Sequence, residues 1–307
     1  MTLFAPEVVL QKLKEGYEFR EAELSRLNLT SANLDRAIFN RCYLKGAVFT
    51  DVSCQTTSFK SSNLSFSKFT NVNLQEACLE RAEFNSAVLA NVILKDANGY
   101  KARLFGAKIE ELKATHINLS FADLRETSGN NLYFHSANFN KACWNQATLK
   151  NLNLERATVT NVAMKNSFIE DSHWLKANLQ NTNLSQSKFE RASFNDASLV
   201  NAKFIHANLN EVDFTAAELI ETSFKNSQLS KINFSDSTLL SANLEGANLN
   251  DIDLSNANLQ DANCEETTWK DVKFDNCNVS GAVFSNAKGL TDEQRQWLKH
   301  NGALNVT

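Results

Sequence analysis

A hydrophobic residue recurs at nearly every fifth position of this 307-residue chain, from Leu24 to Phe284, and the phase never slips. Leu occupies 25 of these 53 positions and Phe occupies 15, and a small or β-branched residue, most often Ala, stands two positions earlier. An α-helix repeats every 3.6 residues and a strand every 2, so neither element fits a period of five. The pattern predicts a chain that turns a corner every five residues, with the large and the small residue of each unit pointing inward.

The composition shows that these corners do not depend on the usual turn residues. The chain has only nine Gly and one Pro, although 43% of its residues are hydrophobic and can build a core. Asn is the favoured residue between the small and the large one of each unit. Asn tolerates left-handed conformations and its amide bonds to nearby backbone, so we expect Asn to serve where Gly would otherwise be required.

Units of the form Ala-Asn-Leu or Ala-Asn-Phe, each followed by two variable residues, occur throughout the repeat. Clean copies begin at Ala32, Ala137, Ala177 and Ala257. In these units the chain resembles the pentapeptide-repeat proteins, over residues 17–288. The resemblance implies an all-β solenoid, namely a right-handed quadrilateral β-helix in which four units make one coil of twenty residues. With four units per coil, the 53 repeat positions predict about 13 coils.

Both ends of the chain are predicted to form capping helices, because an open terminal coil exposes apolar surface and unpaired backbone. Residues 1–16 contain a short helix that Pro6 begins and Gly16 ends. In residues 289–307, Thr291 and Gln294 form a capping box that starts a helix running to about His300.

The second helix carries two large apolar side chains, Trp297 and Leu298. They can simply seal the last coil. The alternative is a homodimer contact, because the resemblance implies that a C-terminal element joins two copies in some members of the family.

The repeat is least regular within residues 95–131. Three large inward positions are nearly empty, and three normally small positions hold large residues: Gly99, Ala114 and Gly129 are the first set, and Leu112, Ile117 and Leu132 the second. Because missing side chains remove packing from consecutive coils, we expect this segment to be the weakest part of the repeat.

The six cysteines do not have the spacing of a metal site or of a disulfide framework. Four occupy inward positions of the repeat and are expected to behave as small core residues: Cys42, Cys54, Cys264 and Cys277. The outward pair, Cys78 and Cys143, is 65 residues apart.

Two of the five histidines, His116 and His135, are 19 residues apart and can lie on neighbouring coils. The sequence offers no third ligand and no nucleophile at a matching phase. A core filled by Leu and Phe also leaves no interior pocket. We therefore expect no metal, no cofactor and no enzymatic activity.

Two outward features are candidates for a binding surface. Residues 232–269 contain seven acidic residues and no Lys or Arg, and either solubility or a basic partner explains them: Asp236, Glu245, Asp251, Asp253, Asp261, Glu265 and Glu266. Val200, Ile220 and Leu240 each follow an inward Leu and are twenty residues apart, so they should form an apolar ladder along one outer edge. The ladder either packs within the chain or docks a partner.

These features favour a non-enzymatic scaffold that docks a protein partner of unknown identity on an outer face. The resemblance implies two alternatives: a DNA mimic that binds bacterial type II topoisomerases and protects gyrase, and an accessory or effector of a bacterial secretion system. A net charge of −4 and the lack of long apolar stretches predict no direct nucleic-acid binding and no membrane insertion. We expect a cytoplasmic location, with a secreted effector as the alternative.

Overall fold

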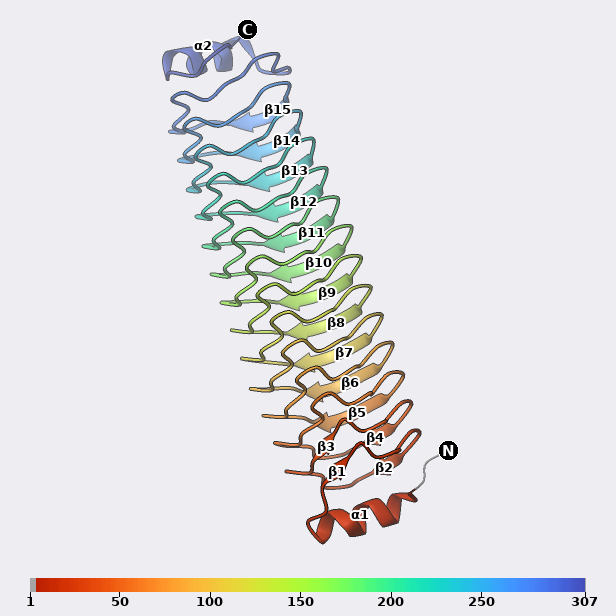
Figure 1. The fold of residues 1–307 in the computed structure, drawn as a ribbon. Helices are drawn as coiled ribbons and strands as arrows, with labels where there is room; N and C mark the ends of the chain where they lie inside the picture. The colour runs from red at the N-terminus through yellow and green to blue at the C-terminus, as the bar shows by residue number, and fades with distance from the viewer. Residues whose placement is uncertain (1–3, 307) are drawn as a thin grey trace. The chain divides into compact units, whose positions relative to one another are not determined.

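The computed structural model describes residues 4–306, and the chain divides into two compact units, the first ending at Ala157 and the second beginning at Thr158. Each unit is a parallel β-solenoid whose coils repeat every twenty residues (Figure 1). Together the units contain about 13 coils, with a short helix at each end of the chain. The predicted all-β solenoid with capping helices is confirmed.

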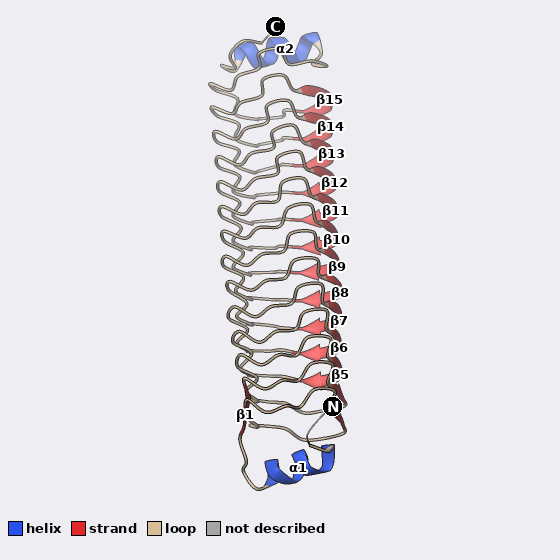
Figure 2. Ribbon diagram, turned by 45° about the vertical axis from the view of Figure 1, so that its right-hand side comes forward, coloured by secondary structure: helices blue, strands red, loops and turns tan. Residues whose placement is uncertain are grey.

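In unit 1 the strands pair in parallel, in the orders β1–β3 and β2–β4–β5–β6–β7–β8–β9. Its strands from β5 onward lie on one side of the coils, away from β1 (Figure 2). The elements are α1 (Pro6–Lys14), β1 (Phe19–Arg20), β2 (Asn28–Thr30), β3 (Phe39–Asn40), β4 (Val48–Thr50), β5 (Lys68–Asn73), β6 (Val88–Ile93), β7 (Lys108–Lys113), β8 (Ser128–Tyr133) and β9 (Thr148–Asn153).

In unit 2 six parallel strands pair in chain order and in the same twenty-residue register, so that Leu209 lies beside Leu229 and Leu249. The helix at its end follows the last strand by eighteen residues. The elements are β10 (Phe168–His173), β11 (Lys188–Ser193), β12 (Asn208–Asp213), β13 (Gln228–Asn233), β14 (Asn248–Asp253), β15 (Thr268–Lys273) and α2 (Asp292–His300).

A left-handed residue marks each corner of the coils. It comes two positions after the large inward residue, as at Arg26, Asn71 and Glu211, where φ is +60°, +56° and +56°. Residues other than Gly rarely adopt this conformation. Here a bond to the next coil stabilises it: the Arg26 N–H, for example, donates to the carbonyl of Lys45 at 2.9 Å. The prediction that the Asn of each unit replaces Gly in left-handed positions is wrong, because those positions hold many residue types and the Asn lies elsewhere.

The Asn between the small and the large residue shapes the chain through its amide. The Oδ1 atoms of Asn33, Asn73 and Asn263 accept the backbone N–H two residues later, at 2.8, 3.0 and 2.9 Å. These are Asx turns, which direct the chain into the following corner. The expected bonding of Asn to nearby backbone is confirmed.

The large and the small residue of each unit point inward, as predicted, and aromatic rings stack inside unit 2. Phe194, Phe214 and Phe234 are fully buried on successive coils. Their ring centroids are 5.0 and 5.2 Å apart and their planes are nearly parallel. Phe204 and Phe224 contact Phe214 edge to face, so this ring packs against aromatic neighbours on several sides.

Truncation of this central ring should destabilise the protein strongly. We expect Phe214→Ala to lower the free energy of unfolding by about 3–5 kcal/mol, because the surrounding rings cannot close the cavity. Lys203→Ala, an exposed change nearby in the sequence, should cost less than about 0.5 kcal/mol. Urea unfolding monitored by circular dichroism measures both, and equal losses would contradict the inward register.

The irregular segment of unit 1 stays in the solenoid. Strands β7 and β8 keep the twenty-residue register across it. A Cβ atom added to Gly129 would lie 2.7 Å from Cδ1 of Leu132, and one added to Gly99 would lie 2.7 Å from Cδ2 of Leu119. Leucine side chains therefore fill the space that the two glycines leave. An apolar cavity of about 20 Å³ remains among the large side chains of these coils.

Exchange of a large and a small residue within one unit tests this compensation. Leu132→Ala alone should cost about 2–5 kcal/mol because it empties the space beside Gly129. Gly129→Leu alone should overpack the same space and cost about 1–3 kcal/mol. The double variant restores the usual order of large and small residues and should recover most of the stability. Additive losses in thermal unfolding would show that Leu132 does not substitute for the missing side chain.

At the end of unit 2, the capping box predicted for the second helix is present. The Gln294 N–H donates to Thr291 Oγ1 at 3.2 Å, and the Thr291 N–H donates to Gln294 Oε1 at 2.9 Å. The Gln294 side chain also donates to the carbonyl of Val272 at 2.9 Å, which satisfies backbone at the end of the solenoid. Gly289 is required just before the helix, because a Cβ there would lie 2.0 Å from the carbonyl oxygen of Trp269.

Candidate interaction surfaces

Large side chains fill the interior of both units, and the apolar cavity of about 20 Å³ in unit 1 is too small for a ligand, so the outer faces are the candidate binding surfaces. Residues 4–306 contain no group of three His, Cys, Asp or Glu side chains that could hold a metal ion. In the same range, no helix has the length and apolar character needed to span a bilayer.

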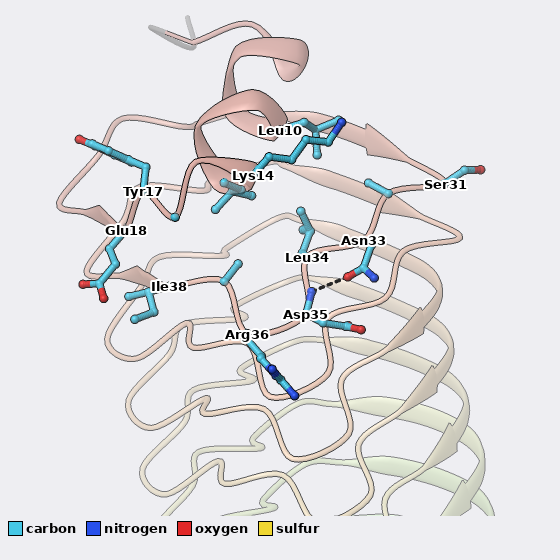
Figure 3. Close-up of a pocket in the computed structure, with 14 residues that line it drawn as sticks. Leu10, Lys14, Tyr17, Glu18, Ser31, Asn33, Leu34, Asp35, Arg36 and Ile38 are labelled. Atoms are coloured by element: carbon cyan, nitrogen blue, oxygen red, sulfur yellow. Dashed lines mark hydrogen bonds between the residues drawn. The ribbon is translucent and has the colours of Figure 1, made fainter.

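A recess of about 530 Å³ lies between α1 and the first coil of unit 1 (Figure 3). Two of its polar groups, Asn33 and Asp35, already have structural roles. The Asn33 side chain accepts the Asp35 N–H, and Asp35 Oδ1 accepts bonds from Ser53 Oγ and the Gln55 N–H at 2.6 and 2.8 Å. The recess is therefore best explained by a short helix that covers only part of a coil.

The apolar ladder, Val200, Ile220 and Leu240, lies at one corner of three successive coils of unit 2. The Asn201 N–H donates to the Ile220 carbonyl at 3.0 Å, and the Glu221 N–H donates to the Leu240 carbonyl at 2.9 Å. These bonds set the three residues one above another. Each side chain is half-buried, so each keeps some surface in contact with solvent.

The structure does not bring the seven acidic residues together. They lie at all four corners or sides of the coil: Glu245, Glu265 and Glu266 at the corner before the strand, Asp251 and Asp253 on β14, Asp236 at the corner after the strand, and Asp261 at the remaining corner. Glu245 and Glu265 lie on adjacent coils, as their spacing predicts. A single acidic strip is therefore not formed, because a stretch of sequence winds around the solenoid while a face repeats only every twenty residues.

Some of these carboxylates also have basic partners on neighbouring coils. Lys225 Nζ lies 2.8 Å from Glu245 Oε2, and Lys273 Nζ lies 3.4 Å from Asp253 Oδ2. Hydrogen bonds from Ser255, and then the Lys273 ammonium, hold the pKa of Asp253 below its ordinary value. Charges outside residues 232–269 thus offset part of the acidic stretch.

A cluster of aromatic and basic side chains lies at one corner of unit 1, and we call it the basic–aromatic edge: Lys60, Tyr100, Lys101, Phe121 and Lys141. The Tyr100 and Phe121 rings meet edge to face at 5.7 Å. Lys101 Nζ lies 5.1 Å from the Tyr100 ring centre and 5.7 Å from that of Phe121, and Lys141 Nζ lies 5.4 Å from that of Phe121. Phe121 is 42% exposed.

The basic–aromatic edge escapes notice in the sequence because its members belong to different residue classes, although Lys101, Phe121 and Lys141 are twenty residues apart. Other outward rings also lie under a cation from a neighbouring coil: Phe66 under Lys45, Phe105 under Arg125, and Phe168 under Lys188. Such contacts are typical cation–π pairs. A comparison of each outward aromatic residue with positions 19 to 21 residues away would have found them.

The two histidines lie side by side, with ring centres 6.4 Å apart. His116 Nδ1 lies 3.1 Å from Asp96 Oδ1, and His135 Nδ1 lies 3.7 Å from Glu155 Oε2. The carboxylates thus face one nitrogen of each ring, and the four groups form two surface pairs.

The cysteines occupy the positions that the repeat predicts. Cys42, Cys54, Cys264 and Cys277 are buried, and Cys78 and Cys143 are half-buried. Burial raises the pKa of the Cys277 thiol to about 12 and also raises the pKa values of the other three buried thiols.

This difference predicts selective thiol labelling. Because the thiolate is the reactive form, a chromogenic disulfide reagent at pH 8 should react with two thiols of the folded protein and with all six in denaturant. Cys78→Ser with Cys143→Ser should leave the folded protein unreactive. Fast reaction of that double variant would contradict the inward placement of the other four cysteines.

The two large residues of α2 lie against the end of unit 2. Leu298 is fully buried and has no surface to offer a second copy. The half-buried Trp297 ring stacks on Phe274, with centres 5.8 Å apart. Trp297 and Leu298 were predicted either to seal the last coil or to form a homodimer contact. Their contacts within the chain correspond to sealing of the last coil.

Comparison with known proteins agrees with this architecture. A family model described as pentapeptide repeats (8 copies) matches segments between residues 18 and 98, and a model described as pentapeptide repeat region matches residues 167–244 and 207–284. No curated protein gave a significant match.

Three solved structures illustrate the similarity. HetL, a pentapeptide repeat protein involved in heterocyst differentiation regulation in the cyanobacterium Nostoc sp. strain PCC 7120, is 23% identical, with 80% of this chain and 96% of HetL covered and a TM-score of 0.29. The plasmid-mediated fluoroquinolone resistance protein QnrB1 is 19% identical, with 64% and 87% covered and a TM-score of 0.44. A pentapeptide repeat protein of the Arabidopsis thaliana thylakoid lumen is 28% identical, with 38% and 77% covered and a TM-score of 0.25.

Proposed function

Because the chain belongs to the pentapeptide repeat family, with interiors filled by the repeat itself, we propose that it is a non-enzymatic scaffold that docks a protein partner on an outer face. The apolar ladder in unit 2 is the observation that carries this proposal. A regular solenoid offers flat, rigid outer faces, and its ends are covered by helices, so specific contacts have to come from outward side chains.

The ladder is suited to docking because its three side chains are aligned and partly exposed. Aliphatic groups at a solvent-facing corner bring no benefit to solubility, whereas their burial against a partner is favourable by about 25 cal/mol for each Å² of apolar surface removed from water. Val200, Ile220 and Leu240 have the spacing of successive coils, so a partner can contact all three with one extended surface.

The ladder is favoured over the DNA-mimic alternative by the placement of the acidic residues. A mimic of duplex DNA needs carboxylates along one face, and the seven acidic residues lie around the coil. The secretion-system alternative has no residue in this chain that supports it.

A charge in the middle of the ladder tests the proposal. We expect Ile220→Asp to abolish co-purification of the partner from the native cell, because a carboxylate at the centre of an apolar contact loses its hydration without gaining an ion pair. Gln180→Asp places the same charge at the equivalent corner one coil before the ladder, and it should leave the complex intact. Both variants should melt within a few degrees of the wild type.

The dependence on salt separates this proposal from docking through acidic residues. An apolar contact should persist in 0.5 M salt, whereas a contact based on carboxylates should weaken as salt screens it. A complex that survives Ile220→Asp yet dissociates in moderate salt would reverse the assignment.

A further inference from the structure

The two units have net charges of opposite sign. Residues 1–157 contain 19 Lys and Arg against 16 Asp and Glu, which gives +3, and residues 158–307 contain 12 against 19, which gives −7. Unit 1 of one copy is therefore attracted to unit 2 of another over distances of about a Debye length, roughly 10 Å at 0.1 M salt.

The basic–aromatic edge of unit 1 presents charge and apolar surface together. Lys101 and Lys141 are exposed, and their ammonium groups lie over aromatic rings rather than in any salt bridge recorded for residues 4–306. Lys60 forms a salt bridge within the chain, with its Nζ atom 2.7 Å from Glu80 Oε2. The edge thus combines two rings with ammonium groups on every second coil.

The corner that carries the ladder in unit 2 has the complementary chemistry. Glu221 directly follows Ile220, and Asp261 lies two coils further along at the same corner. Both are exposed, and within the described part of the chain neither has a salt bridge. Two carboxylates thus lie at the corner that carries the three apolar side chains, while the corner of unit 1 carries two rings and three lysines, with Glu80 and Arg81 between Lys60 and Tyr100.

Both edges also have the same spacing, because both are set by coils stacked at the strand separation of about 4.8 Å. A match between the two edges at one coil is therefore kept at the next coils. Lys60 and Lys101 are two coils apart, and Glu221 and Asp261 are also two coils apart. If the two chains run in opposite directions, Lys101 can face Glu221 while Lys60 faces Asp261.

We propose that the basic–aromatic edge of unit 1 docks antiparallel on the apolar ladder of unit 2 in a second copy of this chain. This inference rests on the proposed function and names the partner of that surface. With Lys101 opposite Glu221, the coil spacing places Phe121 opposite Val200 and Lys60 opposite Asp261. Tyr100 then lies opposite Ile220 beside the Lys101–Glu221 pair, and the coil between the two charged pairs places Leu240 opposite Glu80 and Arg81.

The coil spacing also allows a parallel register, in which Lys101 faces Glu221 and Lys141 faces Asp261, with Phe121 opposite Leu240. The two registers differ at Ser61, which lies opposite the corner of Asp261 only in the antiparallel arrangement.

The basic–aromatic edge is less suited to single-stranded nucleic acid, the other partner that such residues attract. Bases stack on open aromatic faces presented in succession. Here the two rings meet at an interplanar angle of 74°, and lysine side chains cover the face of Phe121. Carboxylates from a protein surface can approach these ammonium groups without displacing them from the rings.

Charge reversal tests the proposed pairing. In sedimentation velocity of the full-length protein at 50 mM salt and at concentrations up to 100 µM, the wild type should have a mass of two or more copies, and Lys101→Glu or Glu221→Lys should each lower self-association at least tenfold. The Lys101→Glu, Glu221→Lys double variant restores opposite charges and should recover most of it. Lys113→Glu, an equal change of net charge on β7, should have little effect.

Directed disulfide formation shows whether the two edges touch. In the Cys78→Ser, Cys143→Ser background, a chain with Ser61→Cys should form a covalent dimer with a chain that carries Gln260→Cys, and neither chain should do so alone. A monomeric wild type, or a double charge variant that stays dissociated, would overturn the proposed pairing. Loss of self-association in Ile220→Asp but not in Lys101→Glu would leave the ladder as a docking surface and overturn the assignment of its partner.

A short DNA oligonucleotide serves as the competing probe. Fluorescence anisotropy with a labelled 20-mer of thymidine should show no binding that depends on Lys101 or Phe121 at physiological salt. Binding lost in Phe121→Ala would instead assign the edge to single-stranded nucleic acid and overturn the proposal.

Discussion

Backbone hydrogen bonds between coils are the constraint on which every other feature of the structure depends. They hold each residue beside the residue twenty positions away, as in the strand pairs of β12, β13 and β14. The same bonds stabilise left-handed corners at residues such as Arg26, a conformation that costs about 1–2 kcal/mol for a residue with a side chain. Corners held by the neighbouring coil do not need Gly or Pro, and this accounts for a chain with only nine Gly and one Pro.

Much of the fold could be predicted because the five-residue period determines which side chains point inward. The inward Phe column, the capping box at Thr291 and the buried cysteines all follow from position within a unit or from local motifs. The role of Asn was only partly predictable: its Asx bond is local, but the left-handed corner depends on a bond to another coil. The compensation of Gly129 by Leu132 likewise depends on rotamers that the pattern of residue sizes does not contain.

The surface was predictable only where its members shared one spacing. Val200, Ile220 and Leu240 are twenty residues apart, so their alignment could be read from the sequence. The acidic residues were grouped by proximity along the chain, and the coil separates them. The basic–aromatic edge was missed for the opposite reason: Lys101, Phe121 and Lys141 belong to different residue classes, and no search for one type of residue joins them.

The five-residue unit also means that an insertion can change the outer surface without changing the core. An insertion of five residues would keep every inward Leu and Phe in phase, and the solenoid would still close. Between Val200 and Leu240, however, such an insertion would rotate each later residue by one side of the coil, and the column Val200, Ile220 and Leu240 would be split between two faces. A binding face therefore requires that its residues stay twenty positions apart, whereas folding requires only that the inward residues stay five positions apart.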